Sequence, residues 1–209
     1  MTRLLKVSGI NLAIAAVGLM LIMPSAMAGG ATEYEKARGY FESGDYHKAA
    51  VMLERAVEQG HSAARLPLAA MYREGMGVDQ NLQKAVALFT VSAKEGYPSA
   101  QFTLGALYRA GEGVEVDYKK ALKWFFRAAR QGEVDSQNNL GTMFEAGRGV
   151  RSSQATALMW YEIASANGSR RAGDNYKRLK RKLSEEQVLK AKKLVHTCLQ
   201  SNYRKCGGR

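Results

Sequence analysis

The chain has 209 residues and carries 31 lysines and arginines against 19 aspartates and glutamates, a formal net charge of +12. A chain of this length corresponds to one domain, which excludes a large multidomain assembly. Its three histidines, His47, His61 and His196, form no His-Glu-x-x-His pattern, which disfavours a histidine-based metal site.

Residues 1–28 have the pattern of a secretory signal. Arg3 and Lys6 precede an apolar stretch over 10–23, and Ala26-Met27-Ala28 fits the small-x-small pattern before a cleavage point. We expect export to a bacterial periplasm, or secretion or attachment to the envelope. The alternative is a retained membrane anchor, although a spanning helix needs roughly 20 apolar residues and this stretch has 14.

A 36-residue period organises the chain up to residue 168. Glycines recur at this step in three series: Gly60, Gly96, Gly132 and Gly168; Gly75, Gly111 and Gly147; and Gly77, Gly113 and Gly149. A period of this length is typical of stacked helical repeats, none of which buries a core alone. The stack forms an extended surface that favours binding of other proteins over catalysis.

Each unit is predicted to contain two antiparallel helices, A and B. In helix A of the third unit, Ala100, Leu104 and Tyr108 are spaced four apart and so share one helical face. Residues suited to cap the start of helix B stand at one offset in four units: Asp45, Asn81, Asp117 and Ser153. The pattern predicts an all-α fold.

The turn between helices A and B reads Gly-x-Gly-Val in three units. We interpret its glycines as structural: the first ends helix A in a left-handed conformation and the second allows a tight turn. These turn residues are Gly75, Gly77, Gly111, Gly113, Gly147 and Gly149. The valine that follows is expected to pack back into the core.

Residues 100–132 read Ala-x-x-x-Leu-Gly-x-x-Tyr-x-x-Gly-x-Gly-Val and then Lys-Ala-x-x-Trp-Phe-x-x-Ala-Ala-x-x-Gly. This pattern resembles the Sel-one-like repeat family, which is related to tetratricopeptide repeats. The resemblance implies an α-solenoid, a superhelix of antiparallel helix pairs. Three full repeats are expected over 61–96, 97–132 and 133–168.

The first unit, 31–60, departs from this pattern. It lacks Gly-x-Gly-Val, so its turn is about five residues shorter and resembles that of a tetratricopeptide unit. An atypical terminal unit is expected of a repeat array. The expected organisation is therefore a signal at 1–28, a helical repeat domain at 29–168 and a C-terminal segment at 169–209.

The C-terminal segment carries the basic excess of the chain. Residues 169–209 hold 13 lysines and arginines against three acidic residues, whereas 29–168 hold 16 of each. Ala172, Tyr176 and Leu179 form the apolar stripe of a first helix, and Ser184 begins a capping box for a second. We expect these helices to cap the repeats, and an amphipathic basic helix is also suited to a membrane surface.

The only two cysteines, Cys198 and Cys206, lie close together in this segment. An even number in an exported protein favours a disulfide, which would pin the chain end to the last helix. Two free thiols are the main alternative. A metal site is disfavoured, because these cysteines and His196 fall short of the four ligands of a structural zinc site.

No sequence motif points to catalysis. The repeated Gly-x-Gly lacks the third glycine and preceding strand of a phosphate-binding loop. A cysteine-rich branch of the Sel-one-like family has been linked to β-lactam binding or hydrolysis, but here the repeats contain no cysteine. We expect no catalytic residue, cofactor or metal. Export disfavours a nucleic acid partner.

The leading hypothesis is a non-enzymatic scaffold or adaptor that binds a partner protein on the concave face lined by the A helices. Candidate contacts are polar A-helix residues just off the packing face: Arg65, Arg73, Gln101, Arg109, Gln137 and Asn138. The alternative is an envelope-associated protein whose basic tail binds anionic lipid or glycan, and a β-lactam-binding or hydrolysing enzyme is a remote third.

Overall fold

A computed structural model describes residues 30–206 as two compact units, divided between Ala64 and Arg65. All regular secondary structure in these residues is helical, with ten α-helices and one short 3₁₀ helix, which confirms the all-α prediction. The predicted signal, 1–28, lies outside the described residues. No helix among residues 30–206 is long and apolar enough to cross a membrane.

The first unit is one helical hairpin, α2 (Ala31–Glu42) and α3 (Tyr46–Glu58), followed by the 3₁₀ helix η1 (Ser62–Ala64). The Asp45 carboxylate accepts a hydrogen bond from the backbone N–H of Lys48 and so caps α3, as predicted. Three residues separate the two helices, four fewer than the seven in later units, so the expected difference of about five is corrected to four.

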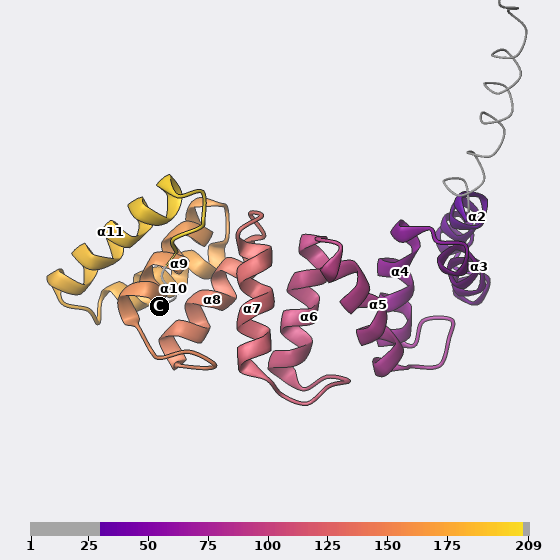
Figure 1. Ribbon diagram of the computed structural model, residues 1–209, viewed down its shortest axis with the longest axis horizontal. Coiled ribbons are helices and arrows are strands. Elements are labelled where there is room, and N and C mark those ends of the chain that lie inside the picture. The colour runs from indigo at the N-terminus through magenta and orange to yellow at the C-terminus, as the bar shows by residue number, and fades with distance from the viewer. Residues whose placement is uncertain (1–29, 207–209) are drawn as a thin grey trace, which may run out of the picture. The chain divides into compact units, whose positions relative to one another are not determined.

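The second unit is a stack of helical hairpins that follow one another in chain order (Figure 1). Its helices are α4 (Arg65–Glu74), α5 (Leu82–Lys94), α6 (Pro98–Ala110), α7 (Tyr118–Ala129), α8 (Val134–Ala146), α9 (Gln154–Ala166), α10 (Arg170–Lys180) and α11 (Glu185–Gln200). The A helices are α4, α6 and α8, and the B helices are α5, α7 and α9. Asn81, Asp117 and Ser153 cap the B helices as predicted.

Small residues let the two helices of a repeat approach each other closely. A Cβ atom built on Gly105 would lie 2.9 Å from the ring of Phe125, and one on Gly141 would lie 2.5 Å from the ring of Tyr161. Each aromatic side chain of helix B therefore packs against the bare backbone of helix A in its own repeat. Both rings are fully buried, and they belong to the core that the 36-residue period predicts.

The six turn glycines have the predicted left-handed backbone, with φ between 68° and 76°. The second glycine of the turn also makes a contact between repeats. A Cβ atom on Gly149 would lie 2.5 Å from the carbonyl oxygen of Tyr118, and one on Gly113 would lie 2.9 Å from that of Leu82. Tyr118 and Leu82 begin the B helices of the preceding repeats, so each turn packs against the start of the preceding B helix.

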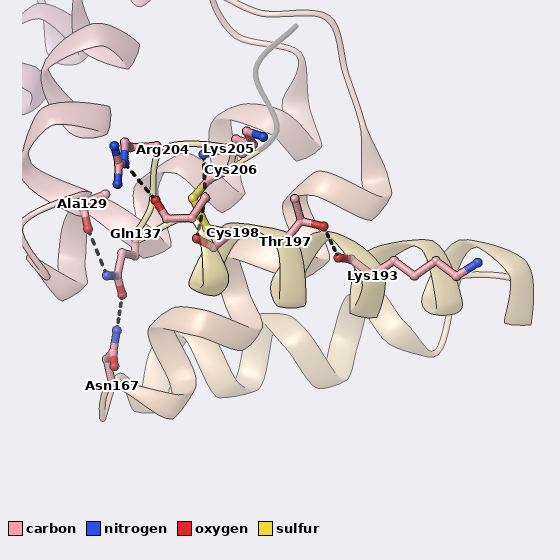
Figure 2. Close-up of a disulfide and its surroundings, with 10 residues drawn as sticks. Ala129, Gln137, Asn167, Lys193, Thr197, Cys198, Arg204, Lys205 and Cys206 are labelled. Atoms are coloured by element: carbon pink, nitrogen blue, oxygen red, sulfur yellow. Dashed lines mark hydrogen bonds between the residues drawn. A yellow bond between two sulfur atoms is a disulfide. The ribbon is translucent and has the colours of Figure 1, made fainter.

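Two helices close the C-terminal end of the stack. Both α10 and α11 pack on α9, and Ala172, Leu179, Ala191 and Cys198 are buried in the shared core. Ser184 and Gln187 form the predicted capping box at the start of α11. Figure 2 shows the disulfide between Cys198 and Cys206, whose Cα atoms are 4.4 Å apart. The bridge ties the turn after α11 to that helix, as predicted.

Candidate functional site

Two of the predicted partner contacts, Gln101 and Gln137, are interior residues. Gln101 is 4% exposed and its amide donates to the carbonyl of Ala93 at 3.0 Å. Gln137 is fully buried and donates to the carbonyl of Ala129 at 3.2 Å. Each side chain thus adds a second hydrogen bond to a carbonyl at the end of the preceding B helix, which also accepts from the backbone N–H of Gly96 or Gly132.

A second residue completes this arrangement in each repeat. The Gln131 amide donates to the Gln101 side-chain oxygen at 2.9 Å. The Asn167 amide donates to the Gln137 side-chain oxygen at 2.9 Å, and Figure 2 shows this second pair. Both pairs are separated by 30 residues in sequence. These polar side chains fix the register of successive hairpins, because each one joins two helix ends.

Arg65 occupies the same position one period earlier. Its guanidinium pairs with the Glu95 carboxylate at 2.6 Å, and its side chain is 17% exposed. The three repeats therefore pair the same two positions with different chemistry, an ion pair in one and amide pairs in the next two. We call Arg65–Glu95, Gln101–Gln131 and Gln137–Asn167 the polar ladder.

Asn138 is also enclosed. It is 4% exposed, and its side-chain oxygen accepts a hydrogen bond from the Asn175 amide of α10 at 3.1 Å. Gln101, Gln137 and Asn138 are therefore not carried forward as partner contacts. Their spacing places them at the edge of the packing face, and in the structure that edge is covered by the neighbouring repeat or, at Asn138, by α10.

Arg73 and Arg109 remain as candidate contacts, one period apart in the last turns of α4 and α6. The Arg73 side chain is 35% exposed and lies 2.6 Å from Glu74 and 3.9 Å from Glu112. Arg109 is half-buried, donates to the side-chain oxygen of Asn139 on α8 and stacks over the Phe125 ring. These contacts orient both guanidinium groups and leave part of each in solvent.

The third position of this series is Glu145, which reverses the charge. Its carboxylate accepts two hydrogen bonds from Arg178 of α10, both at 2.7 Å, and one from the Tyr161 hydroxyl at 2.9 Å. The Arg178 guanidinium holds the pKa of Glu145 below its usual value, although partial burial opposes this. Burial, followed by the hydrogen bond to the Glu145 carboxylate, raises the pKa of the Tyr161 hydroxyl.

Sequence reasoning missed the contact between Glu145 and Arg178. A signal for it was present, since Arg73, Arg109 and Glu145 are 36 residues apart and only the last, next to the basic segment, is acidic. The A-helix face is thus a row of charged side chains that ends where α10 covers it. No cluster of three or more histidine, cysteine, aspartate or glutamate side chains within residues 30–206 could hold a metal ion.

A family model for the Sel1 repeat matches residues 24–61, 63–97, 98–133 and 134–169. The chain belongs to the Sel1 repeat family. The four matches follow the 36-residue period and confirm the resemblance drawn from residues 100–132. They also include residues 31–60, whose short turn between the two helices resembles that of a tetratricopeptide repeat. Sel1 repeats generally mediate protein–protein interactions.

Two solved structures share this architecture. A Sel1 repeat protein from Oxalobacter formigenes is 25% identical, with a TM-score of 0.64 over 75% of this chain and 66% of that one. The protein c5321, a protective antigen of uropathogenic Escherichia coli with an SLR fold, is 26% identical, with a TM-score of 0.57 over 87% of this chain and 47% of that one. This chain therefore spans less than two thirds of either protein. No curated protein gives a significant match.

Proposed function

We propose that this Sel1 repeat protein is an exported, non-enzymatic scaffold that binds a partner protein on the A-helix face. The observation that carries the proposal is the pair Arg73 and Arg109. They stand at equivalent positions of adjacent repeats, are only partly covered, and are oriented by the protein's own side chains. Guanidinium groups held in this way bind carboxylates and carbonyls with defined geometry.

The contacts of Arg73 and Arg109 indicate which chemical groups a partner would present. Arg73 has a weak second contact, 3.9 Å to Glu112, which a carboxylate of a bound protein would replace. Within residues 30–206, Arg109 contacts the Asn139 amide oxygen and an aromatic face and has no ion-pair partner. A partner segment that presents two acidic or carbonyl groups, spaced like adjacent A helices, fits this pair.

Two features support export. Residues 1–28 have a positive start, an apolar stretch and a small-x-small pattern. The disulfide between Cys198 and Cys206 is typical of proteins that mature in oxidising compartments. Export also restricts the partner to proteins of the envelope or the surroundings of the cell. Cleavage before Gly29 is checked by the N-terminal mass of protein purified from the exported fraction.

The test is capture of partners by the immobilised protein, with quantitative mass spectrometry. We expect the double variant Arg73→Ala, Arg109→Ala to lose the specifically captured protein by at least about tenfold, since interface arginines often contribute more than 1 kcal/mol each. Its melting temperature should change little, because partly exposed pairs contribute about 0–1 kcal/mol.

The matched control is Lys119→Ala, Lys123→Ala on α7, where both side chains are exposed. It removes the same amount of charge from a B helix and should retain capture. Equal capture by all three proteins would remove the A-helix face as the binding site. Equal loss in both variants would show that capture depends on charge alone.

A further inference from the structure

An open apolar groove lies between the end of α10 and the first half of α11. Leu183, Val188 and Leu189 supply its apolar lining, and Lys180, Lys192 and Glu185 complete it around a volume of about 320 Å³. The groove is separate from the A-helix face, because α10, α11 and the turn between them supply its lining. We call it, together with the solvent-facing side of α11, the α11 patch.

The patch continues along the solvent-facing side of α11, which carries two exposed leucines among polar residues. Glu185, Leu189, Lys192, His196 and Leu199 are spaced 4, 3, 4 and 3 apart, so they follow one side of the helix. Leu189 is 54% exposed and Leu199 is 50% exposed, and both are among the few large apolar side chains this open to solvent in residues 30–206. The opposite side of α11 holds Ala191 and Cys198 in the core.

Uncompensated positive charge surrounds these leucines. Of the basic residues in the described part of the tail, 169–206, only Arg178 forms an ion pair, and it does so with Glu145 of the repeats. The exposed bases nearest the patch are Lys180, Arg181, Lys182, Lys190, Lys192 and Lys193. Glu185 and Glu186 are the acidic residues at the start of α11, too few to balance them.

We propose that the α11 patch docks the protein on the surface of a bilayer that contains anionic phospholipid. The charge of the patch matches phosphate headgroups, and Leu189 and Leu199 supply apolar contact at the depth of the acyl boundary. An acidic soluble partner would engage the lysines and leave the exposed leucines without a role. This contact is peripheral and goes beyond the binding of a partner protein at the A-helix face.

Vesicle co-sedimentation tests the docking. Phosphatidylcholine vesicles are compared with vesicles containing about 30% phosphatidylglycerol, each at roughly 50 mM and 500 mM salt, where screening differs strongly. We expect sedimentation only with the anionic vesicles, and a large reduction at high salt. The protein and its variants are all purified from the exported fraction. They share one N-terminus, so any contribution of residues 1–28 to vesicle binding is the same in each of them.

Two variants separate charge from apolar contact. The triple variant Lys190→Gln, Lys192→Gln, Lys193→Gln should bind anionic vesicles on the order of 100-fold more weakly, from about fivefold per lysine. Leu189→Ser should bind several-fold more weakly, because it removes the inserted side chain. All four side chains are exposed, so unchanged circular dichroism and melting are expected.

Matched controls make the same kinds of substitution in the repeats, outside the α11 patch. Lys94→Gln, Lys119→Gln, Lys123→Gln removes three exposed charges from α5 and α7, and Val116→Ser removes a side chain that is 53% exposed. Both controls should bind like the wild type. The proposal fails if the control triple loses as much binding as the patch triple, or if neutral and anionic vesicles bind equally.

A soluble polyuronate, which is an acidic polysaccharide, tests whether the α11 patch binds glycan instead of lipid. If the polymer binds the protein as tightly as the vesicles do, and Leu189→Ser changes neither, the partner is an acidic glycan and the membrane proposal is overturned. Loss of vesicle binding in the patch variants with partner capture retained would support the proposal. Loss of partner capture in the Arg73→Ala, Arg109→Ala variant tests the proposed protein-binding face and does not bear on membrane docking.

Discussion

The repeats and the C-terminal segment use their charged residues in opposite ways. Residues 29–168 have 16 basic and 16 acidic residues, and the repeats place polar side chains between neighbouring hairpins. Residues 169–209 have 13 basic and three acidic residues, and within the described part of this segment a single base is paired. The comparison indicates that the repeats use buried polar pairs to join their hairpins and leave a few side chains such as Arg73 and Arg109 partly open, whereas most bases of the described segment are exposed.

The two regions meet at Glu145. In the earlier repeats the equivalent residues are Arg73 and Arg109, which lie on an open face. In the last repeat this position is the acidic Glu145, and Arg178 of α10 donates two hydrogen bonds of 2.7 Å each to its carboxylate. The one ion pair of the described C-terminal segment is therefore the one that attaches it to the repeats.

The largest effect is expected from a residue that joins repeats. Gly149→Ala places a side chain at φ 72° and 2.5 Å from the Tyr118 carbonyl oxygen, so the backbone must shift. We expect a loss of about 3 kcal/mol, combining left-handed strain with overpacking. Gly132→Ala is the matched control, with φ 86° and no neighbouring atom within 4 Å, and should lose about 1 kcal/mol.

Chemical denaturation followed by circular dichroism measures both losses. Equal destabilisation by the two substitutions would mean that only the backbone conformation matters and that the turn makes no essential contact with the preceding repeat.

We expect loss of the disulfide to destabilise the C-terminal segment more than the repeats, because both cysteines belong to that segment. The double variant Cys198→Ser, Cys206→Ser should lose about 2–3 kcal/mol of local stability, because the bridge closes a short loop. Hydrogen exchange should rise in the second half of α11 and in residues 201–206, with little change in α6 and α7. A uniform rise over α6 to α11 would show that the segment and the repeats open as one unit.

The contact between Glu145 and Arg178 gives the smallest of these effects and a pH dependence. The pKa of Glu145 is lowered in the folded protein from an ordinary value of 4.5, chiefly by Arg178. The contact therefore stabilises the protein above that value, and its contribution is lost as the pH falls through the lowered pKa. The partly exposed pair should contribute about 1 kcal/mol.

Urea unfolding at about pH 7 and pH 3 measures this contribution. Glu145→Gln should be less stable than the wild type at the higher pH, and the difference should shrink at the lower one. Arg178→Met should remove the same pH dependence. A difference that stays constant with pH would assign the effect of Glu145→Gln to packing.

Local features of the fold could be predicted from the sequence because nearby residues determine them. Asp117 caps its helix through the backbone of Lys120, three residues away, and Gly147 ends α8 in a conformation that glycine favours. Because the period repeats these signals at fixed offsets, each unit supports the interpretation of the others.

The candidate site was harder to predict because it depends on contacts between repeats. Gln101 and Gln137 have the spacing of residues at the edge of a helix face, and only the position of a helix end about 30 residues away makes them interior. Arg73 and Arg109 share a similar edge position yet remain partly open. Helical periodicity alone does not tell a covered edge from an exposed one.

The most direct test compares two binding activities in two variants. Partner capture and binding to anionic vesicles are measured for the Arg73→Ala, Arg109→Ala protein and for the Lys190→Gln, Lys192→Gln, Lys193→Gln protein. We predict that the first loses capture and keeps vesicle binding, and that the second keeps capture and loses vesicle binding. Loss of both activities in either variant would contradict the division between a protein-binding repeat face and a membrane-binding C-terminal segment.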